Sequence, residues 1–101
     1  MSSIKIKIIE QAEYELDDAF EYYENELSGL GTKFINSFRH AINRIINHPT
    51  AWKCLQDNVR KCRLEKFPFD IIYAIEREYI VIIAVSHHHR RPFYWIDRIE
   101  N

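Results

Sequence analysis

The first apolar residues of the chain alternate with basic ones. Isoleucine and lysine take turns from Ile4 to Ile8, and Ile9 follows. An alternation with a period of two, formed by β-branched residues, is typical of a strand with one buried face. We therefore expect a β-strand over residues 4–9.

The hydrophobic period lengthens to three or four residues at Glu10, which predicts an amphipathic helix over residues 10–27. Its apolar positions are Ala12, Leu16, Ala19, Phe20, Tyr23 and Leu27. Acidic residues fill many of the other positions and suit the positive end of the helix dipole. Gly29 and Gly31 are the only glycines of the chain, so residues 28–31 are expected to end the helix and turn the chain.

A second amphipathic helix is predicted directly after this turn. Thr32 is a suitable N-cap, because its hydroxyl can accept a hydrogen bond from a backbone N–H of the first helical turn. The apolar stripe of this helix consists of Phe34, Phe38, Ala41, Ile42, Ile45 and Ile46. The sequence Asn-His-Pro at residues 47–49 should end the helix, because the residue before a proline disfavours helical geometry.

The second half of the chain has the pattern of strands. Residues 50–58 show no hydrophobic period and are expected to form a loop, after which residues 59–64 alternate again. Two longer apolar runs, residues 69–75 and 79–85, are separated by a short charged segment, which predicts an antiparallel hairpin. The second run is apolar on both faces, so we expect it to be a central strand.

The remaining residues complete the expected fold. Residues 86–92 are polar and basic and should form a loop, and residues 94–99 are long enough for a short C-terminal helical turn. The elements follow the order βααβββ, which predicts the α+β class, with two helices packed on one face of a mainly antiparallel sheet. With 101 residues and a mass of 12.2 kDa, the chain is expected to be one domain over residues 1–101.

The composition argues against a disordered or membrane-spanning chain. Hydrophobic residues make up 47% of it, including six Phe, six Tyr and two Trp, which is enough to form a core. The longest apolar run, Ile80–Val85, is far shorter than the roughly 20 residues of a bilayer span, and residues 1–5 lack a signal pattern. We expect no membrane association and a cytoplasmic location.

Cysteines and histidines do not predict a metal site. Cys54 and Cys62 are expected to be reduced, because their spacing is not that of a zinc site and the chain needs no disulfide. The three histidines at residues 87–89 have too few further ligands nearby. His87 is interpreted as a buried or capping residue, with acid–base catalysis by one of the three as the alternative. No cofactor-binding motif is present, so we expect no cofactor.

Charge is distributed unevenly along the chain. The net charge is −1, but residues 1–27 carry eight acids and two lysines, whereas residues 28–101 carry twelve Lys and Arg and seven acids. Much of the basic excess lies within residues 53–66 and at Arg90 and Arg91. This split predicts a basic working surface and an acidic helix that forms a solvated outer face. The pI near 6.5 disfavours a plain nucleic-acid-binding module.

Five short motifs follow one another along the chain. They are EL-x-DA-x-x-YY at residues 15–23, GLG-x-x-F at 29–34, I-x-HP-x-x-W at 46–52, R-x-x-RL-x-x-FPF-x-I-x-Y at 60–73 and AV-x-H-x-x-R-x-P-x-YW-x-x-R at 84–98. With these motifs in this order, the chain resembles the RelE/ParE superfamily of type II toxins. Within that superfamily it is most similar to the ParE-like group described as plasmid stabilisation proteins.

The resemblance implies a growth-inhibiting toxin that is neutralised by a cognate antitoxin protein in a toxin–antitoxin hetero-oligomer. The antitoxin should bind as an extended segment or an amphipathic helix across the sheet and helices. The resemblance allows two different targets. ParE-type members bind DNA gyrase without a known bond-breaking step of their own, whereas ribonuclease members cut mRNA in the ribosomal A site. The resemblance therefore leaves open whether the chain is an enzyme.

The candidate target-binding residues are basic, and Lys61, Arg63 and Arg90 match functional positions of the superfamily. Lys61 and Arg63 share one face of a predicted strand, and Arg90 and Arg91 follow the last strand. We expect these four cations to bind the target, either nucleic-acid phosphates or an acidic protein surface. The alternative interpretation is that Lys61 and Arg63 lie on a solvated outer face of the sheet and bind no target.

For the ribonuclease alternative, the resemblance implies Lys61, Arg63, Arg90 and Tyr94 or its neighbour as catalytic residues, and the acid–base chemistry of imidazole adds His87 to this set. Asp70 departs from this pattern, because it stands where the ribonuclease members have a further arginine. Cleavage by attack of a 2′-hydroxyl needs cations on the scissile phosphate. A carboxylate at this position would repel that phosphate. Asp70 therefore favours a gyrase inhibitor over a ribosome-dependent mRNA endonuclease.

Overall fold

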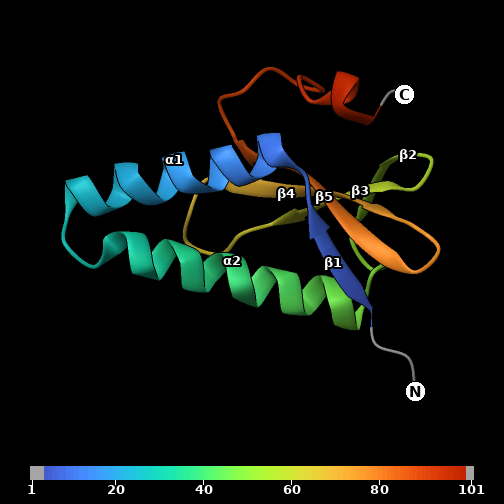
Figure 1. Cartoon of the computed structure of the whole chain (residues 1–101), viewed down its shortest axis with the longest axis horizontal. Helices are drawn as coiled ribbons and strands as arrows, with labels where there is room; N and C mark the ends of the chain where they lie inside the picture. The colour runs from blue at the N-terminus through green and yellow to red at the C-terminus, as the bar shows by residue number, and fades with distance from the viewer. Residues whose placement is uncertain (1–3, 100–101) are drawn as a thin grey trace.

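The computed structural model of the chain describes residues 4–99, and the outer residues of the expected domain, 1–3 and 100–101, lie outside this range. Two helices pack on one side of a five-stranded sheet (Figure 1). The elements are β1 (Lys5–Ile8), α1 (Glu10–Glu26), α2 (Leu30–Asn47), β2 (Lys53–Gln56), β3 (Val59–Arg63), β4 (Phe69–Ile75), β5 (Tyr79–His87) and the 3-10 helix η1 (Ile96–Ile99). The predicted α+β class is confirmed.

The sheet has the strand order β1-β5-β4-β3-β2. β1 pairs with β5 in parallel, and all other pairs are antiparallel. β5 is therefore an internal strand, as its apolar faces predicted. It runs to His87, beyond the expected end at Val85, because Phe69 and Asp70 continue to pair with it there.

The expectation of a loop over residues 50–58 was wrong in its second half. Residues 53–56 form the edge strand β2, which pairs with β3 across a tight turn at Asp57 and Asn58. Asp57 adopts a positive φ of 46°, which aspartate tolerates better than most residues. The four residues of β2 are too few to show a period of two, and the pairing of Lys53 with Lys61 depends on the turn.

Thr32 does not cap α2, which begins two residues earlier at Leu30. The cap is provided by α1 instead, because the Glu24 carboxylate accepts hydrogen bonds from the backbone N–H groups of Gly29 and Gly31, each at 3.0 Å. Gly29 has a φ of 92°, which favours glycine. A Cβ on Gly31 would lie 2.8 Å from the Phe20 ring and backbone, so the glycine lets the two helices approach closely.

The core has two parts, one on each face of the sheet. The larger part lies between the sheet and the helices and contains fully buried Phe34, Ala41, Ile45, Ile71, Tyr73 and Ile82. The smaller part lies on the opposite face, where Val59, Ile72, Ala74, Ile83 and Ala84 are covered by Trp95 of the C-terminal segment, which we define as residues 88–99. A register shift between β4 and β5 lets the adjacent residues Ile83 and Ala84 both join the smaller part.

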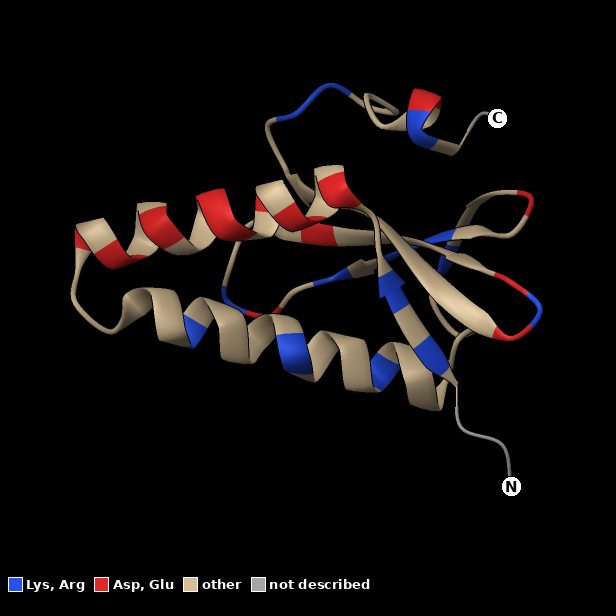
Figure 2. Ribbon diagram, in the orientation of Figure 1, with Lys and Arg blue, Asp and Glu red and all other residues tan. Residues whose placement is uncertain are grey.

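The charge split of the sequence is visible in the fold. α1 carries eight acids and no Lys or Arg, whereas α2 carries three Lys and Arg and no acid (Figure 2). Within residues 4–99, no helix has both the length and the apolar character needed to cross a membrane.

Candidate functional site

The face of the sheet opposite the helices carries the predicted basic surface. Lys61 and Arg63 alternate on β3 with Cys62, which is buried on the helix side, so both cations project from the opposite face. Asp70 pairs with Arg63 in the register of β3 and β4 and lies beside them. The expectation that Lys61 and Arg63 share a strand face is therefore confirmed.

Two adjoining hollows, which extend from this face to Arg44 of α2, form what we call the basic groove. The first has a volume of about 500 Å³ and is lined by Arg44, Trp52, Lys53, Lys61, Arg63, Asp70 and His88. The second, of about 190 Å³, continues toward the C-terminal segment and is lined by residues that include Lys61, Asp70, His88, Arg90, Arg91 and Trp95. Lys61, Asp70 and His88 line both hollows, which are therefore continuous. The groove thus contains the four cations that the sequence analysis predicted to bind the target: Lys61, Arg63, Arg90 and Arg91.

Asp70 is the acidic member of the basic groove. Its carboxylate lies 3.3 Å from Nε2 of His88, and its side chain is only 15% exposed. A carboxylate next to Lys61 and Arg63 partly neutralises their field. The groove can therefore bind an anionic surface, but it does not offer an uninterrupted cluster of cations for one phosphate.

Arg60 belongs to the structure of the sheet rather than to the groove. Its side chain projects to the opposite face from Lys61, and its guanidinium donates hydrogen bonds to the carbonyl groups of Thr50, at 3.2 Å, and Trp52, at 2.8 Å. These bonds hold the segment before β2 in place. The first arginine of the fourth sequence motif, Arg60, is thus explained by folding.

His87 and His89 contact each other, whereas His88 lies against Asp70. Nδ1 of His87 accepts a hydrogen bond from the backbone N–H of His89 at 3.0 Å, so His87 caps the turn after β5, in agreement with one of its two interpretations. Burial and the neighbouring His89 and His88 lower the pKa of His87 below its usual value. The neutral imidazole is favoured, as its role as an acceptor requires.

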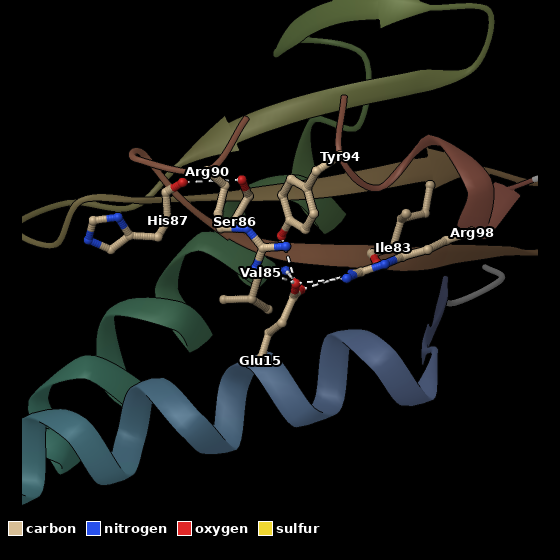
Figure 3. A network of polar contacts seen from close by, with 8 residues as sticks. All are labelled: Glu15, Ile83, Val85, Ser86, His87, Arg90, Tyr94 and Arg98. Atoms are coloured by element: carbon tan, nitrogen blue, oxygen red, sulfur yellow. Dashed lines mark hydrogen bonds and ion pairs between the residues drawn. The ribbon is translucent and has the colours of Figure 1, made fainter. Parts of the chain in front are cut away.

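Glu15 of α1 is the functional candidate that the sequence analysis missed. It was assigned to a solvated outer face, which is wrong, because its side chain is only 14% exposed and lies at the C-terminal segment (Figure 3). The Tyr94 hydroxyl donates a hydrogen bond to Glu15 at 2.7 Å, and the Arg98 guanidinium forms a bidentate ion pair with it at 2.9 Å. The hydrogen bond to Glu15 raises the pKa of Arg98 further.

Tyr94 is therefore not a free hydroxyl. Burial, followed by the hydrogen bond to Glu15, raises the pKa of Tyr94 to about 12. Arg90 stacks on the Tyr94 ring, with Cζ 3.7 Å from the ring centre, and its Nη1 lies 3.8 Å from Glu15 Oε2. Two members of the ribonuclease set, Arg90 and Tyr94, thus pack against each other beside a carboxylate.

The raised pKa predicts a change in alkaline stability. The folded state favours the neutral phenol of Tyr94. Its contribution to the free energy of unfolding is therefore fully present below pH 10 and is lost as the pH rises from 10 through about 12. We expect Tyr94→Phe to reduce stability at pH 8 but to lose less further stability between pH 9.5 and 12. Urea unfolding at a series of pH values measures this, and equal pH slopes for the two proteins would contradict it.

Comparison with known proteins gives the family. A family model described as the ParE toxin of the type II toxin-antitoxin system, parDE, matches residues 6–92. Among solved structures, a chain of the "Chromosomal ParDE TA system from P. aeruginosa" aligns with a TM-score of 0.72 and 17% identity, over 84% of this chain and 96% of that chain. This structural likeness shows the fold alone, and no curated protein matches the chain. Because the family model covers most of the sequence, the chain belongs to the ParE toxin family of type II toxin–antitoxin systems.

Proposed function

We propose that this toxin stops growth by binding DNA gyrase and that a cognate antitoxin neutralises it in a hetero-oligomer. Because gyrase acts on DNA in the cytoplasm, the toxin would act there as well. In this proposal the chain breaks no bond itself, and the basic groove is its target-binding surface. The whole chain, residues 1–101, would act as one domain.

The observation that carries the proposal is the engagement of Tyr94. In the ribonuclease alternative this residue would take part in catalysis, but its hydroxyl donates to Glu15 at 2.7 Å. A phenol with a pKa of about 12 is also poorly suited to exchange protons near neutral pH. Cleavage by this arrangement would require Tyr94 to leave Glu15 first.

The groove itself supports binding over cleavage. Charge-assisted contacts from Lys61 and Arg63 can hold an acidic protein surface or a DNA backbone, and neither use requires a proton relay. Asp70, 15% exposed in the same groove, would oppose the charge that develops on a phosphate during cleavage. Arg90, which is 51% exposed, extends the basic surface toward the C-terminal segment.

A separate hollow suits the antitoxin. It has a volume of about 710 Å³ and lies between the first half of α2 and the loop before β4. Apolar Tyr23, Leu30 and Phe67 line it together with Lys33 and Lys66. An antitoxin segment with apolar and acidic side chains fits this lining. Antitoxin binding and target binding would then use different surfaces.

Two assays run on the same protein test the target. We expect the purified chain to inhibit supercoiling by gyrase and to cause linear DNA to accumulate, because ParE-type binding interrupts the gyrase cycle. Primer extension on ribosome-bound mRNA after induction should show no new cuts. Codon-positioned cuts without gyrase inhibition would reverse the assignment in favour of the ribonuclease alternative.

A further inference from the structure

Four hydrogen bonds converge on the carboxylate of Glu15. Three come from the side chains of Tyr94 and Arg98, and the fourth comes from the backbone N–H of Val85 at 2.9 Å (Figure 3). A carboxylate that is 14% exposed needs such partners, because burying an unpaired charge is costly. Glu15 thus connects three separate parts of the chain: α1, β5 and the C-terminal segment.

The position of this contact follows from the short length of β1. β1 pairs with β5 only as far as Ile8 and Ile82, and Ile9 adds one more bond to the Ile82 carbonyl. Beyond this point no strand within residues 4–99 pairs with β5 on that side. Side chains take the place of the strand, since Glu15 accepts from the N–H of Val85 and Arg98 donates to the carbonyl of Ile83 at 3.1 Å.

The hydrogen bond between Glu15 and Tyr94 also affects where Arg90 lies. The Arg90 guanidinium rests on the ring of Tyr94, whose hydroxyl is held by Glu15. Arg90 itself makes only a longer contact with Glu15, at 3.8 Å, and is half exposed. Its position at the basic groove therefore depends on a tyrosine that Glu15 fixes.

We infer that Glu15 is a positioning residue, which holds the C-terminal segment against β5 and so presents Arg90 and Arg91 at the basic groove. It acts through Tyr94 and Arg98, and through its own contact with Arg90 at 3.8 Å, and does not touch the target. This inference rests on the proposed function in one respect, namely that the basic groove is the toxic surface. The family match ends at residue 92, before both of these partners.

Glu15→Gln and Arg98→Gln test the inference from the two sides of the ion pair. Glu13→Gln is the matched control, because Glu13 is an exposed acid on the same helix. In the full chain, losing one charge-assisted contact should open the segment about ten- to a hundred-fold more often. We therefore expect trypsin to cleave after Arg90 at least about tenfold faster in both variants, with cleavage in α2 unchanged.

Toxicity should fall with this local opening. We expect both variants to arrest growth at least about tenfold less effectively than Glu13→Gln, at equal protein level and with antitoxin binding retained. Arg98→Lys keeps the charge and should restore a large part of the activity, which a loss of packing alone would not explain. If Glu15→Gln fails to fold, Arg98→Gln alone tests the inference, because this variant leaves Glu15 bound to Val85 and Tyr94.

Three results would overturn the inference. One is unchanged cleavage after Arg90 in both variants, and another is faster cleavage with full toxicity. The third is a uniform increase in cleavage at all sites together with a lower melting temperature, which would make Glu15 a general stabiliser. If the unchanged toxin fails to inhibit gyrase while growth arrest still depends on Glu15 and Arg98, only the proposed target is wrong.

Discussion

Replacing Arg63 with alanine is expected to relieve growth arrest while the protein remains folded. The side chain is exposed at the end of β3, and no hydrogen bond or ion pair to its guanidinium is found within residues 4–99. Such substitutions usually change the free energy of unfolding by no more than about 0.5 kcal/mol. A lost charge-assisted contact to the target instead costs about 1.5–3 kcal/mol, roughly ten- to a hundred-fold in affinity.

Growth after induction, antitoxin affinity and thermal melting together separate these effects. Lys61→Ala and Arg90→Ala should behave like Arg63→Ala, whereas His88→Ala should stay toxic. Arg39→Ala is the matched control, since Arg39 is an exposed arginine on α2, away from the basic groove. Full toxicity of Arg63→Ala, combined with loss of toxicity in His87→Ala at an unchanged melting temperature, would favour acid–base catalysis and the ribonuclease alternative.

The central part of the groove could be predicted from sequence because Lys61 and Arg63 lie on one strand. Lys61 and Arg63 are two residues apart, and the alternation of the strand places them on one face whatever the rest of the fold does. Glu15 could not be assigned in this way, because its partners Tyr94 and Arg98 lie 79 and 83 residues away. All three occur in the motifs that indicated the family, but a motif does not show which of its residues meet.

The same distinction between local and distant effects explains the errors in the fold. The periods of the two helices and of the hairpin arise within each segment, so they were visible in the sequence. The start of α2 depends on the Glu24 carboxylate of the preceding helix, and β2 becomes a strand only because β3 is beside it. Neither contact leaves a pattern within the segment that it shapes.

Phe34→Ala is expected to cause the largest loss of stability. The side chain is fully buried and meets three aromatic rings, with centroid distances of 5.4 Å to Tyr23, 5.3 Å to Phe67 and 5.1 Å to Phe69. Removing a buried phenylalanine ring costs about 3–5 kcal/mol, because apolar contacts are lost and a cavity remains. For a domain of this size the melting temperature should fall by on the order of 20 °C.

Phe93→Ala provides the comparison, because Phe93 is 44% exposed, although its ring lies 5.2 Å from that of Trp95. Its melting temperature should change by a few degrees at most, since little area is buried. Tyr23 and Phe67 also line the apolar hollow, so Phe34→Ala should weaken antitoxin binding as well as folding. Differential scanning calorimetry and antitoxin titration measure the two effects. Equal melting temperatures for the two variants would show that the aromatic cluster around Phe34 does not dominate the stability of the helix-side core.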